Sequence, residues 1–333
     1  MKKQSAQVRH VLRRPENVPG LPKNADPAWP GVAGTLLLAH ALLAFIALLL
    51  RQAWPMFDRL VSSDSWLSYV VGAVLMQGGL ILLPTLIVVM LAKIQPRQLL
   101  GGKPRAGSLI LGVIIGIPAA VVFQGMNNLL IYGLAKAGLR LPAVTGPEPP
   151  GLFSRPIPIM FLVIIVSAVI PGIVEELMFR GVIFASLTST GAGLSAGLWQ
   201  AAAFSLFHGN PFFILPPFLA GMMLATIRRN SDSLLPAILA HISLNLSLAA
   251  LTPLLPSLTA DYLTSTSGEA PSLFYASLIA ALVAAVALVP MLVLINLPGE
   301  REKTSGRLVP VPVDWKFILA FFIMIAAMVI EYN

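Results

Sequence analysis

Three charged side chains lie inside an apolar stretch of the sequence that is long enough to cross a membrane. Residues 157–184 are almost continuously apolar, yet they contain Glu175, Glu176 and Arg180. A charge in the hydrocarbon core costs free energy unless it is paired or solvated, so charges that occur there usually serve a function. We therefore interpret this stretch as a candidate site in which a carboxylate acts on a water molecule or a metal ion.

The spacing of the three charges suggests different roles for the two glutamates. On a helix, Glu176 and Arg180 are i and i+4 neighbours on one face, whereas Glu175 points about 100° away. Arg180 can neutralise Glu176 as its charge partner, which leaves Glu175 free to act as a general base toward water. The alternative is a purely structural ion network that holds helices together. Two carboxylates for one arginine favour the catalytic interpretation.

A histidine ends the next apolar stretch. His208 follows residues 195–207, and Asn210–Pro211 shortly after it predicts the end of a helix. A helix C-terminus favours a protonated or hydrogen-bonded imidazole. A histidine at such a boundary is commonly only an interfacial polar residue, so a catalytic role for His208 depends on its neighbours.

A second histidine supplies such a neighbour. His241 and Asn245 lie inside the apolar stretch 233–255, and their i, i+4 spacing puts both side chains on one helix face. This pair could stabilise the oxyanion of a reacting carbonyl, or it could only form hydrogen bonds between helices. Five other polar residues in apolar stretches are interpreted as helix–helix contacts: His40, Gln77, Gln124, Asn127 and Asn128.

Composition identifies the class of protein. Of 333 residues, 57% are hydrophobic and only 11% are charged, about half the charged fraction of a soluble domain. The fold class we predict is an all-α polytopic membrane protein with eight or nine transmembrane helices, because the apolar runs lack the alternation of barrel strands. The nine candidate spans are residues 31–50, 66–91, 107–135, 157–184, 193–207, 212–227, 233–255, 272–297 and 315–330, two of them short.

Charge distribution predicts the topology. Residues 1–30 form a basic, proline-rich tail without a cleavage pattern, which we expect in the cytoplasm. With that start, alternation puts most Lys and Arg residues on the cytoplasmic side, as the positive-inside rule requires. The net charge of +8 therefore indicates contact with anionic membrane lipids and not nucleic-acid binding. The chain has no cysteine, which excludes disulfides and thiol catalysis.

The polar residues also suggest a domain organisation. After the tail, residues 31–150 carry three leading helices, and a proline-rich segment then introduces the block that holds the candidate site, residues 151–255. Residues 256–333 contribute two C-terminal helices.

Three motifs in this order resemble the CPBP family of intramembrane proteases. They are Glu-Glu-x-x-x-Arg over 175–180, Phe-x-x-x-His over 204–208 and His-x-x-x-Asn over 241–245. The family includes the CAAX prenyl proteases and bacterial Abi-domain proteins linked to bacteriocin processing and immunity. The resemblance covers about residues 157–255 and suggests an integral protein of the bacterial cytoplasmic membrane.

The resemblance implies hydrolysis of a peptide bond at or in the membrane, on a peptide or lipidated-protein substrate. Glu175 and His208 would activate a water, with Glu176 beside them, and His241 with Asn245 would stabilise the oxyanion. In an alternative family mechanism, Glu175, His208 and His241 would ligate zinc as in a metalloprotease. The sequence alone leaves zinc open, because these residues lack the local H-E-x-x-H spacing of soluble zinc proteases.

Two other functions remain open at this point. Buried Glu, Arg and His residues could form the proton relay of a membrane transporter, although carriers usually show two related halves and this chain does not. The protein could also be a non-enzymatic membrane scaffold or immunity protein.

Straight spans would also put His208 near the opposite membrane face from Glu175 and His241. Either a kink at Pro171–Gly172 or a re-entrant pair of short helices over 193–227 would remove this conflict.

Overall fold

The computed structural model describes residues 29–62, 65–138, 155–188, 193–251, 269–296 and 313–332. These residues are helical except for short connections and one isolated bridge between Gly101 and Ser233. The chain is an all-helical polytopic membrane protein, as its composition predicted. The α-helices before residue 139 are α2 (Trp29–Ala53), α3 (Pro55–Ser62), α4 (Trp66–Ala73), α5 (Leu83–Leu91), α6 (Pro96–Leu100) and α7 (Ala106–Lys136). Those after it are α8 (Ile157–Ile164), α9 (Ile170–Glu176), α10 (Phe184–Thr188), α11 (Gly193–Phe207), α12 (Leu215–Ser231), α13 (Leu235–Leu251), α15 (Glu269–Asn296) and α16 (Trp315–Tyr332).

Three π-helical segments interrupt two of the long spans. They are η1 (Val74–Leu82), η3 (Ile165–Val169) and η4 (Leu177–Ile183). The segment η1 joins α4 to α5, whereas η3 and η4 flank α9 on both sides. π-Helical turns are rare and occur frequently at functional sites, so their presence around Glu175 and Glu176 marks this part of the fold.

In the part of the chain that the structure describes, six helical stretches are long and apolar enough to cross a membrane: Gly31–Ala53, Trp66–Leu91, Ala106–Lys136, Ile157–Thr188, Phe274–Ile295 and Trp315–Tyr332. Two shorter apolar helices, Leu194–Phe207 and Leu235–Leu251, accompany them. The sixth expected span, over residues 212–227, corresponds to α12. This helix starts at Leu215 and continues through Arg228 and Arg229, so its last turn is polar.

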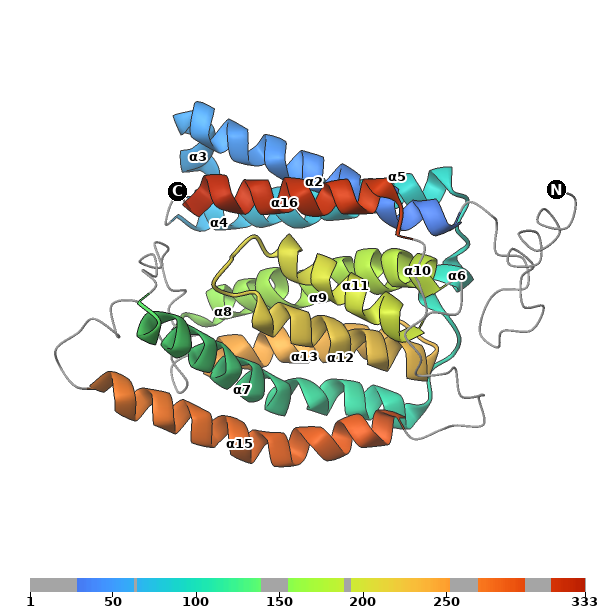
Figure 1. The fold of residues 1–333 in the computed structure, drawn as a ribbon. Coiled ribbons are helices and arrows are strands. Elements are labelled where there is room, and N and C mark those ends of the chain that lie inside the picture. The colour runs from blue at the N-terminus through green and yellow to red at the C-terminus, as the bar shows by residue number, and fades with distance from the viewer. Residues whose placement is uncertain are drawn as a thin grey trace, which may run out of the picture.

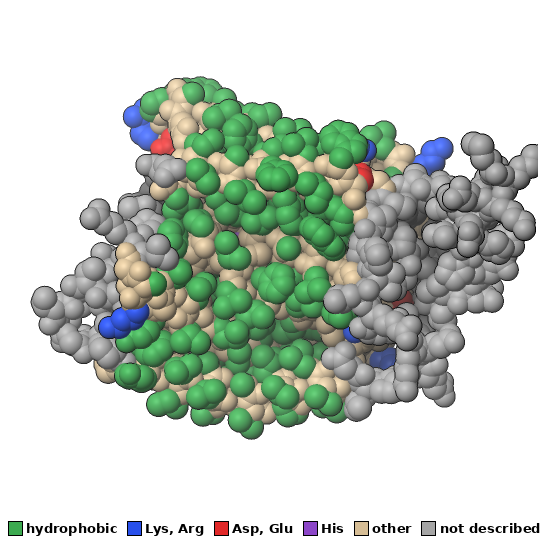
Figure 2. All heavy atoms as spheres, viewed as in Figure 1, with side chains coloured by type: hydrophobic (Ala, Val, Ile, Leu, Met, Phe, Trp, Pro, Cys, Tyr) green, Lys and Arg blue, Asp and Glu red, His purple; other side chains and the backbone are tan. Residues whose placement is uncertain are grey.

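The outermost helices lie on opposite edges of the bundle. Figure 1 shows α2 and α16 along one edge, α15 along the other beside α7, and α9, α11, α12 and α13 between them. On the face in Figure 2, hydrophobic side chains cover the middle of the molecule and the visible charged side chains lie toward its two ends. This pattern is the one expected for helices surrounded by lipid.

Glycines allow α13 to pack closely on α7. A side chain at Gly112 would meet the carbonyl oxygen of Pro236, and one at Gly116 would meet the backbone of Ser243 and Leu244. The hydroxyl of Ser243 donates a hydrogen bond to the carbonyl oxygen of Val113. Small residues let helices approach in this way within membranes. The contact fixes the helix that carries His241 and Asn245.

The three largest fully buried side chains lie on η4 and α11. Arg180, Phe179 and Phe204 are the largest fully buried ones, and a charged residue therefore lies at the centre of an aromatic core. The expected domain boundaries after residues 150 and 255, and most of the N-terminal tail, lie outside the described residues.

Candidate functional site

Glu176 and Arg180 form a buried ion pair, as their i, i+4 spacing predicted. Arg180 Nη1 donates to Glu176 Oε1 over 2.5 Å, and both side chains are fully buried. Arg180 Nη2 donates to the carbonyl oxygen of Gly221 over 3.3 Å, and the guanidinium lies 4.4 Å from the centroid of the Phe204 ring. Because its partners lie on α9, α12 and α11, Arg180 connects η4 to three other helices.

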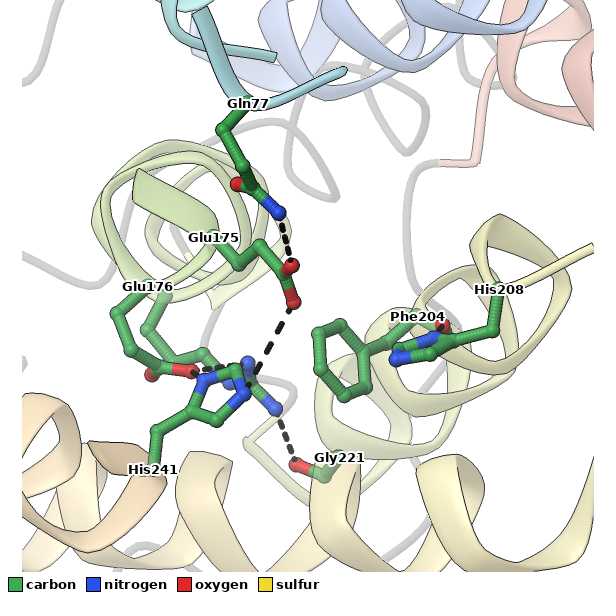
Figure 3. A network of polar contacts seen from close by, with 8 residues as sticks. Gln77, Glu175, Glu176, Phe204, His208, Gly221 and His241 are labelled. Carbon is green, nitrogen blue, oxygen red and sulfur yellow. Dashed lines mark hydrogen bonds and ion pairs between the residues drawn. The ribbon is translucent and has the colours of Figure 1, made fainter. Parts of the chain in front are cut away.

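His241 lies between the two glutamates. Its Nδ1 is 2.9 Å from Glu176 Oε1, and its Nε2 is 3.9 Å from Glu175 Oε2 (Figure 3). An ionised carboxylate only accepts hydrogen bonds, so Nδ1 carries the proton in the contact with Glu176. In the neutral imidazole, Nε2 then presents its lone pair toward Glu175. Glu176 thus sets both the orientation and the tautomer of His241.

Glu175 is held from a helix that sequence reasoning did not connect with the site. Gln77 Nε2, in η1, donates to Glu175 Oε1 over 2.9 Å (Figure 3). From the sequence, Gln77 is one of five polar residues expected at helix–helix contacts. The contact does join two helices, but one partner is the candidate base. A glutamine in an apolar span was the available signal, and it does not distinguish Gln77 from Gln124 or Asn127.

His208 directly follows the last residue of α11, Phe207. Gly209 adopts a positive φ of 66°, a conformation that suits glycine and ends helices. His208 Nδ1 donates to the carbonyl oxygen of Phe204 over 2.7 Å, which leaves Nε2 as an acceptor. The residue is exposed at the surface of the described structure.

The Phe204 ring separates His208 from the other site residues. Its centroid lies 4.8 Å from that of His208 and 5.8 Å from that of His241, edge to face in both cases. Figure 3 shows this ring between His208 and the pair formed by Glu175 and His241. The structure therefore brings His208 near the glutamates, but not into hydrogen-bonding contact with them.

The short length of α11 explains this proximity. Its 15 residues extend over about 22 Å, less than the roughly 30 Å of a hydrocarbon core, so its C-terminal end lies beside the middle of longer helices. The helices α11 and α12 are both short, with 15 and 17 residues, and whether they re-enter the membrane stays a prediction. The span Ile157–Thr188 remains helical through Pro171, with η3 and η4 on either side.

Asn245 lies one turn beyond His241 on α13 and is partly buried. Within the described residues, its side-chain amide has no hydrogen-bond partner.

The proposed zinc ligands only partly converge. Glu175 Oε2 and His241 Nε2 face each other, and the contact of His241 Nδ1 with Glu176 resembles the outer-shell support of a metal-bound histidine. His208 lies beyond Phe204, however, and no group of three His, Asp or Glu residues in the described ranges is close enough to hold a metal ion. A catalytic zinc normally has three protein ligands, so these residues in this arrangement do not complete such a site.

Residues 157–247 match a family model described as Rce1-like, type II CAAX prenyl endopeptidase. The matched segment contains all three motifs, which confirms the resemblance drawn from them. It indicates a family of CAAX-type intramembrane proteases. The match covers less than a third of the chain and excludes the helix that carries Gln77. No curated protein and no solved structure matches the chain.

Proposed function

We propose that this protein is a membrane-embedded endopeptidase of the CAAX-protease type, in which Glu175 activates water for attack on a peptide bond. The observation that carries the proposal is the opposition of Glu175 Oε2 and His241 Nε2 at 3.9 Å, with both side chains almost completely buried. Two acceptors at this separation can share one water molecule, which donates one hydrogen bond to each of them. The match of residues 157–247 to a protease family supports the same reaction class.

In the proposed reaction, the water oxygen attacks the carbonyl carbon of the scissile peptide bond while Glu175 takes one of its protons. The tetrahedral intermediate collapses when the C–N bond breaks, and the proton passes from Glu175 to the departing amine nitrogen. Glu175 returns to its carboxylate form, so protons balance over the cycle. A positioned base of this kind typically contributes a factor of about 10² to 10⁴ in rate.

The other site residues have distinct proposed roles. Glu176 and Arg180 hold His241 in the tautomer that orients the water. The amide of Asn245, which has no hydrogen-bond partner among the described residues, is the proposed donor for the oxyanion, as the resemblance implied. His208 approaches the water after Phe204 moves aside, because in the described arrangement the ring lies between them. Substrate that binds against the Phe204 ring would displace it.

The reaction can be tested with two internally quenched peptides added to the purified protein in liposomes. One carries a farnesylated cysteine followed by three residues, and the other is identical but has no lipid. We expect cleavage by the wild-type protein, and selective cleavage of the first peptide would identify lipidated substrates.

Glu175→Ala and His208→Ala should each abolish this cleavage, since each removes a group that acts on the water. Membrane insertion and melting temperature should remain close to those of the wild type. Glu331→Ala is the matched control, because Glu331 lies in an exposed ion pair with Arg51 away from the site. Full activity in either site variant would contradict the proposal. So would a wild-type protein that cleaves neither peptide.

A further inference from the structure

The two oxygen atoms of the Glu175 carboxylate each face a different polar group. Gln77 Nε2 donates to Oε1 over 2.9 Å, while Oε2 faces His241. The amide nitrogen must face the carboxylate, because the reversed amide would oppose two oxygen atoms. The terminal torsion of a glutamate side chain is broad and roughly two-fold, so the side chain alone does not determine which oxygen faces the site. The hydrogen bond from Gln77 supplies this missing constraint.

The helix that presents Gln77 runs beside the span that carries Glu175. Two polar contacts connect these helices: Tyr69 with Ser167, and Gln77 with Glu175. Eight residues separate the two contacts on each helix, so the helices are parallel and in register. Gln77 lies within η1 and Glu175 between η3 and η4, and π-helical turns are a frequent feature of functional sites.

A buried amide in an apolar span is costly unless it is hydrogen-bonded. The side-chain oxygen of Gln77 is buried and has no hydrogen-bond partner among the described residues. A glutamine present only to join helices would be expected to use both ends of its amide. Gln77 instead makes a single side-chain hydrogen bond, and its acceptor is the candidate base.

We propose that Gln77 is a positioning residue for the reaction, which holds the Glu175 carboxylate so that Oε2 faces His241 and the attacking water (Figure 3). The inference rests on the proposed function and extends the site to a helix outside the family-matched segment. A misplacement of a reacting group by about 1 Å can cost a factor of about 10² in rate.

The test compares Gln77→Met with Tyr69→Phe. Methionine has a similar length and fills irregular apolar space, but it cannot donate a hydrogen bond. Tyr69→Phe removes a polar contact between the same two helices, two turns away from the site. With the farnesylated quenched peptide in liposomes, Gln77→Met should lower kcat by at least about tenfold while KM changes less than about twofold, because the base is misplaced and substrate binding is not. Tyr69→Phe should leave both parameters unchanged.

A second measurement does not need activity. Infrared difference spectra of Gln77→Met against the wild type should show a shift in a carboxylate stretching band, because that band responds to hydrogen bonding. The shift should disappear when the same comparison is made in a Glu175→Ala background. Tyr69→Phe should give no such band. If Gln77→Met does not fold, Gln77→Leu also removes the donor without adding a titratable group and should show the same loss of kcat.

The outcomes separate this inference from the proposed function. If the wild type cleaves and Gln77→Met behaves like Tyr69→Phe, the positioning role is wrong and the protease assignment remains. If the wild type cleaves neither quenched peptide, the protease assignment fails and the infrared band decides whether Gln77 orients Glu175. If the carboxylate band does not shift in Gln77→Met, the inference is wrong in either case.

Discussion

The two adjacent glutamates have different partners, and this difference indicates a structural role for Glu176 and a chemical role for Glu175. Glu176 Oε1 receives hydrogen bonds from both Arg180 and His241, so its charge is compensated inside the protein. Glu175 has one neutral donor, Gln77, and faces the unprotonated nitrogen of His241. Burial costs an uncompensated carboxylate more than a paired one. We infer that the fold stabilises Glu176 and leaves Glu175 reactive.

Arg180→Ala should damage folding more than it damages the chemical step. The substitution leaves Glu176 buried without its cationic partner, which can cost roughly 3–5 kcal/mol in the free energy of unfolding. Arg51→Ala is the control, because Arg51 lies in partly exposed ion pairs of the kind worth about 0–1 kcal/mol. Melting curves in detergent, recorded beside cleavage assays, measure both effects. An inactive Arg180→Ala that melts like the wild type would mean that Arg180 acts on the substrate.

The incomplete ligand set leads to a prediction about metal. Glu175 Oε2 and His241 Nε2 face each other, but no group of three possible ligands occurs among the described residues, and a catalytic zinc normally has three protein ligands. We therefore expect protein purified without chelator to contain well below one equivalent of zinc, and cleavage to continue in the presence of a strong chelator. Elemental analysis provides the measurement. One equivalent that is lost in both His241→Ala and His208→Ala would establish the metalloprotease alternative.

At the scale of elements, the contact between α7 and α13 controls the position of His241. A methyl group at Gly116 would collide with the backbone of α13 between Ser243 and Leu244. Gly116→Ala should therefore destabilise the protein by about 1–3 kcal/mol and lower kcat, because α13 must move. Gly133→Ala is the same substitution on the same helix, with nothing near the new methyl group. It should stabilise α7 by roughly 0.5–1 kcal/mol. Equal melting temperatures for the two variants would contradict this account.

Much of the helical arrangement could be predicted from the sequence, because membrane helices follow directly from apolar run length. The expected span 66–91 coincides with the observed Trp66–Leu91, and those at 31–50 and 315–330 differ from the structure by only a few residues. The polar last turn of α12, with Arg228 and Arg229, extends past the apolar run because propensity and packing continue the helix. Hydrophobicity alone does not register that extension.

The site could be predicted in part. Helical periodicity was sufficient for the pair Glu176 and Arg180, since both residues lie on one helix. It could not identify Gln77 as a partner of Glu175, which is 98 residues away along the chain. It also gave no indication that Phe204 would stand between His208 and His241. Both features depend on how separate helices pack, and a single sequence does not encode that as a local pattern.

At the scale of the whole molecule, the helix directions agree with alternate crossing of a membrane. Arg51 and Glu331, at the C-terminal ends of α2 and α16, form an ion pair, and Lys316 donates to Thr35 near their N-terminal ends. These two helices are therefore parallel, as the first and ninth spans of an alternating chain should be. In contrast, α15 is antiparallel to α7, because Tyr132 stacks on Phe274 while Gly125 contacts Ala281.

Absolute orientation then depends on the distribution of positive charge. The connection between α5 and α7 carries Lys93, Arg97, Lys103 and Arg105, and the positive-inside rule predicts that this segment lies in the cytoplasm. We then expect the opposite end of α7 to face outward. The absence of cysteine makes the chain suitable for a direct test, because single introduced thiols give no background labelling.

We expect Lys103→Cys and Ala137→Cys to be labelled from opposite sides of the membrane. Both positions are exposed, and they flank the 31-residue helix α7, which is long enough to cross the hydrocarbon core completely. A membrane-impermeant maleimide added to sealed right-side-out vesicles should label Ala137→Cys and leave Lys103→Cys unlabelled until the vesicles are opened. The unmodified protein should remain unlabelled throughout. The reverse pattern would mean an inverted chain, and equal labelling of both variants in sealed vesicles would mean that α7 does not span the membrane.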